Sequence, residues 1–152
     1  MSNVRPILLA EDNPNDVELV LTALREARLA NEVQVARDGA EALDYLYRRG
    51  AFTGRPGPLP AVLLLDLKMP KVDGREVLRQ VRADPALRAL PVVVLTSSRE
   101  ERDLVQSYEL GVNAYVVKPV DFAEFTAAVT HLGCFWALLN ELPPAKVPPP
   151  DR

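Results

Sequence analysis

The chain has 152 residues, which predicts one domain with a sizeable core and no sensor or DNA-binding module beside it. Its formal charge of -3 comes from interspersed signs without a basic stripe, which argues against nucleic acid as a direct ligand. The single cysteine, Cys134, excludes an intrachain disulfide, and the lack of a signal peptide or of a membrane-length apolar stretch predicts a cytoplasmic protein without membrane contact.

Five short apolar runs follow one another along the chain, and amphipathic or polar segments separate them. This alternation is typical of βα units in an α/β fold with a five-stranded parallel sheet. After the first run, Asn13 predicts a helix cap and Pro14 the first helical position. Right-handed crossovers would place the helices on both faces, giving a doubly wound sheet. The predicted strands are residues 6–10, 32–36, 61–65, 91–95 and 114–117, and the later helices are residues 39–49, 74–83, 100–110 and 121–140.

Two segments depart from a minimal fold of this kind. Residues 50–60 are rich in glycine and proline and form a loop longer than the usual two to six residues. Its length is a reason to consider a contact surface, but a tolerated surface insertion is the preferred interpretation. Residues 142–152 contain five prolines, which predicts a disordered or extended tail.

Polar residues stand at the ends of four of the five predicted strands. Glu11 and Asp12 follow the first strand, Asp66 the third, Thr96 the fourth and Lys118 the fifth. Because the strands are parallel, these groups are expected to meet at one edge of the sheet, where open α/β folds bind their ligands.

Three carboxylates at one edge would repel one another unless a cation holds them. An oxygen-only cluster suits octahedral Mg²⁺, which keeps several waters and favours phosphate oxygens. The hydroxyl of Thr96 and the ammonium of Lys118 can carry the remaining charge of a phosphoryl group. The sequence therefore predicts a divalent metal and a phosphoryl site.

These strand ends resemble the receiver domain of two-component response regulators over about residues 5–132. The motifs that carry the resemblance are ILLAEDN at residues 7–13, LDLKMP at 65–70 with Asp73 and Gly74, LTS at 95–97 and YVVKP at 115–119. The resemblance implies a flavodoxin-like (βα)5 fold with strand order 2-1-3-4-5. It further implies a receiver domain over residues 1–141, followed by the tail.

The resemblance also implies the roles of the site residues. Asp66 would accept a phosphoryl group from a phosphohistidine on a sensor histidine kinase. Asp12 would bind Mg²⁺ directly, Glu11 would act mainly through bound water, and the backbone carbonyl of Lys68 would be a further ligand. A Glu at position 11, where many receivers have Asp, lengthens the reach to the metal by one methylene.

The switch residues follow from the same resemblance. Thr96 would donate a hydrogen bond to a phosphoryl oxygen. Lys118 would pair with the carboxylate before phosphorylation and with the phosphoryl group after it. Tyr115 matches the aromatic residue whose rotamer reports the state of Thr96.

Each residue also has a plainer interpretation. Glu11 and Asp12 could simply favour the positive end of the following helix, and Thr96 and Lys118 could be an ordinary strand end and a solvated charge. Their joint occurrence, in the required order, favours the phosphoryl site.

Two other functions remain as alternatives. A Mg²⁺-dependent phosphatase with an Asp nucleophile would need a second Asp two positions after Asp66, where this chain has Lys68. A pseudo-receiver that only binds partners would not need the full set of site residues. We therefore expect a switch that is not an enzyme on exogenous substrates.

The last predicted helix carries a longer apolar stripe than one small sheet needs. Phe135, Trp136 and Leu139 extend it beyond Leu132, which predicts a homodimer through the end of this helix. Together with the loop of residues 50–60, residues 132–133 and 136–144 resemble the single-domain regulators paired with phytochrome-type sensor kinases. The downstream protein target is left open.

Overall fold

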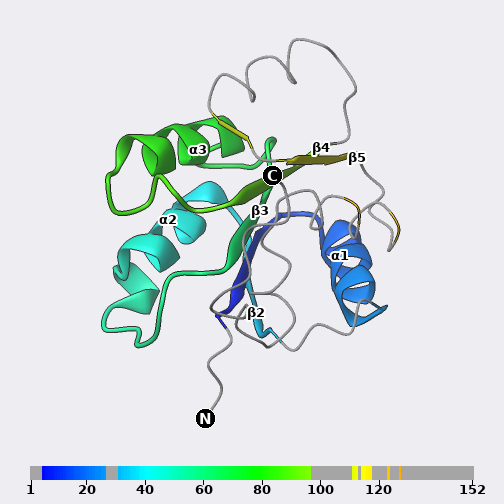
Figure 1. Ribbon diagram of the computed structural model, residues 1–152, viewed down its shortest axis with the longest axis horizontal. Helices are drawn as coiled ribbons and strands as arrows, with labels where there is room; N and C mark the ends of the chain where they lie inside the picture. Colours follow the sequence, from blue (N-terminus) through cyan, green and yellow to red (C-terminus); the bar gives the residue numbers. More distant parts are fainter. Residues whose placement is uncertain are drawn as a thin grey trace, which may run out of the picture.

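The computed structural model describes residues 5–26, 31–96, 111–112 and 114–117, together with residues 123 and 127. Within them, parallel strands form one five-stranded sheet in the order β2-β1-β3-β4-β5, which confirms the predicted α/β fold (Figure 1). The strands are β1 (Ile7–Ala10), β2 (Val33–Ala36), β3 (Val62–Asp66), β4 (Val92–Thr96) and β5 (Ala114–Val117). The helices are α1 (Pro14–Glu26), α2 (Gly39–Tyr47) and α3 (Gly74–Ala83), with a 3-10 turn η1 (Gly50–Phe52).

Some predicted elements lie outside this part of the chain. The helix expected at residues 100–110 and the tail at 142–152 are not among the described residues. Of the helix expected at 121–140, only residues 123 and 127 are described.

The two faces of the sheet bury alternate side chains of β3. Figure 1 shows α2 and α3 on one face and α1 on the other. Leu63 and Leu65 belong to the core cluster beneath α2 and α3, whereas Val62 and Leu64 belong to the cluster beneath α1. All four are 0% exposed, which explains why this strand is an uninterrupted apolar run.

The start of α1 agrees with the sequence. The Oδ1 of Asn13 accepts hydrogen bonds from the backbone N–H of Asn15 at 2.8 Å and of Asp16 at 3.1 Å. Asn13 is therefore the N-cap and Pro14 the first helical residue, as predicted. This cap turns the chain out of β1 directly after Glu11 and Asp12.

Helix α2 is shorter than predicted. Asp38 caps its start by accepting a hydrogen bond from the N–H of Glu41 at 2.7 Å. The helix ends at Tyr47, two residues before the expected end, because Arg48 adopts a left-handed backbone with φ of 56°. The prediction of residues 39–49 was wrong at this end, since an arginine gives no local signal for a conformation usually taken by glycine.

The loop of residues 50–60 has a hydrogen-bond network of its own. The guanidinium of Arg55 donates to the carbonyl of Tyr45 at 3.0 and 3.3 Å and lies 3.9 Å from the centroid of its ring. Arg48 donates to the carbonyls of Arg55 at 3.2 Å and Gly57 at 2.6 Å. Two arginines therefore hold the loop to the end of α2, at the edge of the sheet opposite Asp66.

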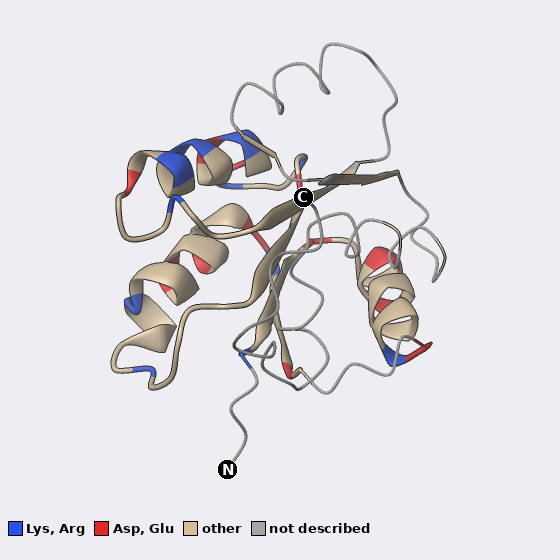
Figure 2. Cartoon of the chain, in the orientation of Figure 1, with Lys and Arg blue, Asp and Glu red and all other residues tan. Residues whose placement is uncertain are grey.

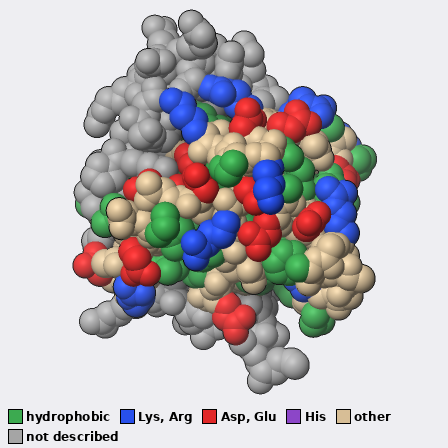
Figure 3. Space-filling model, turned by 180° about the vertical axis from the view of Figure 1, so that it is seen from behind, with side chains coloured by type: hydrophobic (Ala, Val, Ile, Leu, Met, Phe, Trp, Pro, Cys, Tyr) green, Lys and Arg blue, Asp and Glu red, His purple; other side chains and the backbone are tan. Residues whose placement is uncertain are grey.

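Charged side chains of both signs are distributed over the described surface. Basic residues recur along α3, and acidic residues lie on each of the three helices (Figure 2). The face seen in Figure 3 carries blue and red side chains interspersed with apolar ones. In the described ranges, no helix has the length and apolarity needed to cross a bilayer.

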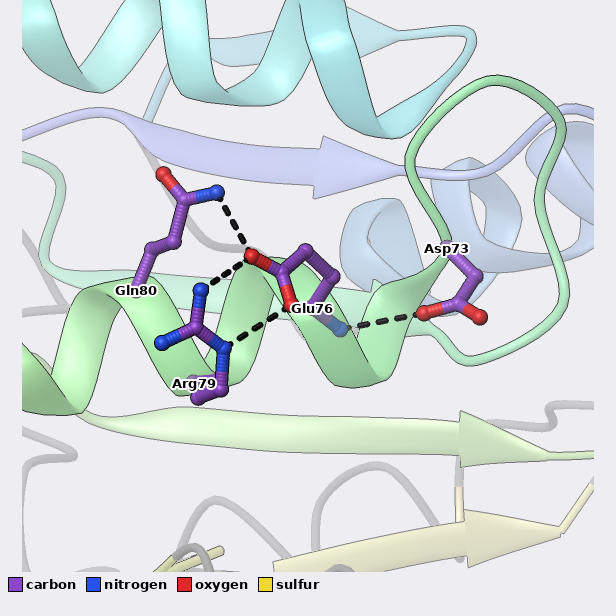
Figure 4. A network of polar contacts seen from close by, with 4 residues as sticks. All are labelled: Asp73, Glu76, Arg79 and Gln80. Carbon is purple, nitrogen blue, oxygen red and sulfur yellow. Dashed lines mark hydrogen bonds and ion pairs between the residues drawn. The ribbon is translucent and has the colours of Figure 1, made fainter.

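A polar network covers the first turns of α3 (Figure 4). Asp73 caps the helix by accepting a hydrogen bond from the N–H of Glu76 at 3.0 Å. The Glu76 carboxylate accepts hydrogen bonds from Nε and Nη2 of Arg79 and from Nε2 of Gln80. The hydrogen bonds from Arg79 and then from Gln80 lower the pKa of Glu76 from its usual 4.5 to about 2.

Glu76 is expected to contribute to the acid sensitivity of the fold. A carboxyl whose pKa is depressed in the folded state stabilises it above the ordinary pKa, and this contribution is lost as the pH falls through the folded value. In a Glu76→Gln variant, the free energy of unfolding should therefore fall less steeply than in the wild type between pH 4.5 and about 2. Urea titrations across this range measure the slope. Glu18→Gln, an exposed residue of α1, controls for charge removal, and equal slopes in wild type and Glu76→Gln would contradict the prediction.

Candidate phosphoryl and metal site

The first two acidic residues of the site follow β1. The N–H of Glu11 still donates to the carbonyl of Ala36 on β2, at 2.9 Å, so the residue stays fixed to the sheet beyond the strand. Its side chain is fully buried, and its Oε2 accepts a hydrogen bond from the N–H of Asn13 at 3.1 Å. Asp12 is exposed. The same turn therefore presents one buried and one exposed carboxylate.

Asp66 is the last residue of β3 and is 5% exposed. Ala10 pairs with Leu65 across β1 and β3, so Glu11 and Asp66 each lie one residue beyond that pair. The N–H of Lys68 lies 3.4 Å from the Oδ1 of Asp66, in position to donate to it. The adjacent strands thus bring Asp66 to the level of the acidic pair.

The three carboxylates converge as the sequence predicted. One oxygen each from Glu11, Asp12 and Asp66 lies within 4.8 Å of the other two. Two of the three residues are buried, where negative charges are poorly screened and strongly disfavoured without a compensating cation. The donor set consists of oxygen alone, which fits a hard divalent cation such as Mg²⁺. These residues therefore fit a divalent metal.

The connection after Asp66 is packed tightly against the start of α3. The N–H of Gly74 donates to the carbonyl of Leu67 at 2.8 Å. A Cβ at Gly74 would come within 2.3 Å of the carbonyl oxygen of Asp66 and 2.6 Å of the Cα of Leu67. The absence of a side chain at Gly74 therefore lets α3 begin against the backbone of the candidate phosphoacceptor.

The fourth and fifth strands end beside this cluster. Asp66 pairs with Leu95 across β3 and β4, so the backbone of Thr96 comes one residue beyond that pair. Thr96 pairs in turn with Val117 at the end of β5. Tyr115 is half-buried and packs against the core beneath α2 and α3. The strand register thus places the backbones of Thr96 and of Val117, the residue before Lys118, at the carboxyl edge of the sheet.

The model of the response regulator receiver domain matches residues 7–130. The chain belongs to the response regulator receiver family. The chain is also 40% identical over 139 residues to the response regulator Rcp1 of Synechocystis sp., across 91% of this chain and 93% of Rcp1.

Solved structures of response regulators resemble this receiver domain. The bacteriophytochrome response regulator AtBRR is 67% identical, with a TM-score of 0.83 over 91% of this chain and 99% of that one. The Mn²⁺-bound form of Rcp1 is 39% identical, with a TM-score of 0.74 over 93% and 99%. The phosphorylated cyanobacterial phytochrome response regulator RcpA is 40% identical, with a TM-score of 0.74 over 88% and 94%. The resemblance to receivers of the phytochrome-associated type is confirmed.

The remaining predicted site residues of the receiver lie outside the described structure. They are the side chain of Thr96, all of Lys118, and the predicted dimer residues Phe135, Trp136 and Leu139. Their roles, and the homodimer itself, stay predictions.

The sequence did not predict the close contact of Gly74 with Asp66, although Asp73 and Gly74 belong to the motifs that resemble receiver domains. Asp73 caps α3 with its side chain. A glycine directly after a capping residue, eight positions beyond the candidate nucleophile, was the available signal.

Proposed function

We propose that this receiver domain is a phosphorylation-controlled switch in a two-component phosphorelay, with Asp66 as the phosphoacceptor. The convergence of Glu11, Asp12 and Asp66 within 4.8 Å at the carboxyl edge of the sheet is the observation that carries the proposal. The phosphorylated form of RcpA supports it, since that relative is a receiver of the same subfamily.

In the proposed reaction, a carboxylate oxygen of Asp66 attacks the phosphorus atom of a phosphohistidine on a sensor histidine kinase. The P–O bond forms as the P–N bond breaks, and the imidazole leaves with the bonding electrons and takes up a proton. The N–H of Lys68, 3.4 Å from Oδ1, helps to orient the attacking carboxylate. Burial of Asp66 at 5% exposure limits the access of water to the acyl phosphate that results.

The proposed metal ligands are the carboxylates of Glu11, Asp12 and Asp66 and the backbone carbonyl of Lys68. Mg²⁺ held by these residues would offset the negative charge of the carboxylates and coordinate oxygens of the phosphoryl group. The Mn²⁺-bound form of Rcp1 supports a divalent cation in this type of protein. Thr96 and Lys118 would contact the remaining phosphoryl oxygens.

A sensor histidine kinase of the phytochrome type is the proposed phosphodonor, as the names of the bacteriophytochrome and cyanobacterial relatives suggest. Phosphorylation would draw Thr96 toward the site and let Tyr115 turn inward, which shifts a pre-existing equilibrium of the surrounding surface. Changed chemical shifts in β5 on phosphorylation would support this step, and unchanged shifts would refute it.

The proposal is tested by incubating the protein with Mg²⁺ and acetyl phosphate and measuring its intact mass. A single phosphoryl adduct that is labile in base is expected, and EDTA should suppress it because the three carboxylates need a counter-ion to accept a dianionic donor. Absence of an adduct would instead favour a pseudo-receiver. Sustained turnover of an aryl phosphate would favour a phosphatase, which the exposed Lys68 at the acid/base position argues against.

A further inference from the structure

One arginine of α3 binds three backbone carbonyls that lie outside its helix. The Nη1 of Arg82 donates to the carbonyls of Arg88 at 3.0 Å and Leu90 at 2.8 Å. Its Nε and Nη2 donate to the carbonyl of Gly111 at 3.3 and 2.7 Å. A cation near a helix C-terminus is favourable in itself, but that would not require carbonyls from two other segments.

The three carbonyls belong to the entries of two neighbouring strands. Leu90 lies two residues before β4 begins, and Gly111 lies three residues before β5 begins. Gly111 has a φ of 78°, and a Cβ there would lie 3.1 Å from the Nε of Arg82, so the guanidinium rests against this turn. Val112, the next residue, is buried in the core beneath α2 and α3. Arg82 therefore joins the amino ends of β4 and β5.

These two strands lead to the residues proposed to contact the phosphoryl group. β4 ends at Thr96, and Lys118 directly follows β5. β5 is a four-residue strand at the edge of the sheet and pairs only with β4 in the described sheet. A short edge strand has few ladder hydrogen bonds to fix its register, and a one-residue slip would turn every side chain to the other face.

We propose that Arg82 is a positioning residue for phosphoryl transfer: it fixes β5 against β4 from the amino edge and thereby places Lys118 and Tyr115 relative to Asp66. This inference rests on the proposed function of Asp66. The planar guanidinium suits the task because its fork of donors binds several carbonyls at once, whereas a lysine ammonium cannot reproduce that geometry. Its side chain is half-buried, and its hydrogen bond to Leu90 is the part-buried one, whereas those to Arg88 and Gly111 lie at the exposed surface.

The proposed metal ligands give a sharp test, because Glu11 and Asp12 directly follow β1 and Asp66 ends β3, whereas Arg82 joins β4 and β5. In Arg82→Ala, the rate of phosphorylation by acetyl phosphate should fall about tenfold through misplacement of Lys118, while Mn²⁺ affinity, measured by calorimetry, stays within about twofold of the wild type. The phosphorylation rate of Arg82→Lys should lie between those of Arg82→Ala and the wild type. Arg79→Ala, which removes a neighbouring surface arginine of α3, should change neither quantity.

Hydrogen exchange provides the second measurement. Protection of the amides at residues 112 and 114–117 should fall in Arg82→Ala and not in Arg79→Ala. If Arg82→Ala fails to fold, Arg82→Lys decides by the same two measurements. Wild-type phosphorylation rates in the Arg82 variants, or a parallel loss of phosphorylation and Mn²⁺ affinity in them, would overturn the positioning role. If the wild type itself accepts no phosphoryl group, the proposed function fails, and exchange in β5 still tests whether Arg82 fixes the strand.

Discussion

An Asp66→Asn variant is expected to gain no phosphoryl adduct with acetyl phosphate and Mg²⁺ under conditions in which the wild type is modified. The amide is a poor nucleophile. Among the described residues, Glu11 is the one other carboxylate that is buried at the carboxyl edge of the sheet. Intact mass measured before and after base treatment checks this. A labile adduct of equal yield in the variant would show that another residue is the acceptor.

The free energy of unfolding of the same variant, measured with and without Mg²⁺, should show whether the three carboxylates bind a metal. Without a divalent cation, replacing one of three carboxylates within 4.8 Å relieves repulsion, so the free energy of unfolding should rise by about 1 kcal/mol. Added Mg²⁺ should stabilise the wild type more than the variant, because a ligand bound only by the folded state stabilises it according to its affinity. Urea titrations with EDTA or with Mg²⁺ separate the two effects. A variant that is less stable in EDTA would contradict the repulsion.

A Gly74→Ala substitution is the second change with a large expected effect. A methyl group 2.3 Å from the carbonyl oxygen of Asp66 cannot be accommodated without moving the helix or the strand end. Overpacking of this kind is expected to lower the free energy of unfolding by about 2 kcal/mol. Phosphorylation by acetyl phosphate should slow at least about tenfold, because the backbone that moves carries the nucleophile.

Gly54→Ala is a matched control for Gly74→Ala. Gly54 lies in the loop of residues 50–60, with a φ of 76° and nothing within 4 Å of an added Cβ. Its substitution should lower the free energy of unfolding by about 1 kcal/mol through backbone strain and leave phosphorylation unchanged. Equal phosphorylation rates in both variants would show that the start of α3 does not position Asp66.

The central strands could be predicted from the sequence because short, local runs of apolar residues indicate buried strands. The run that became β3 is apolar throughout, and the structure buries alternate side chains on each face of the sheet. Asn13 and Pro14 marked the start of α1 through hydrogen-bonding chemistry confined to three neighbouring residues. The acidic cluster followed once the strands were taken as parallel, since parallel strands end at a common edge.

Contacts between distant segments could not be predicted in this way. Arg82 meets Gly111, which is 29 residues further along the chain, through carbonyl groups that every residue possesses. The left-handed backbone of Arg48 ends α2 although its side chain resembles those of ordinary helical residues. The partners of Arg82 are backbone carbonyls, which cannot be recognised from the pattern of side chains, and the conformation of Arg48 has no signal in its residue type.

The loop of residues 50–60 has a consequence for association. Arg48 and Arg55 order it within the free protein, so its conformational entropy is lost on folding and not on encounter with another molecule. A molecule that docked there would meet a preorganised surface at the far end of the sheet from Asp66. Such docking would leave the phosphoryl site open, and occupancy of the loop and phosphorylation could then vary independently.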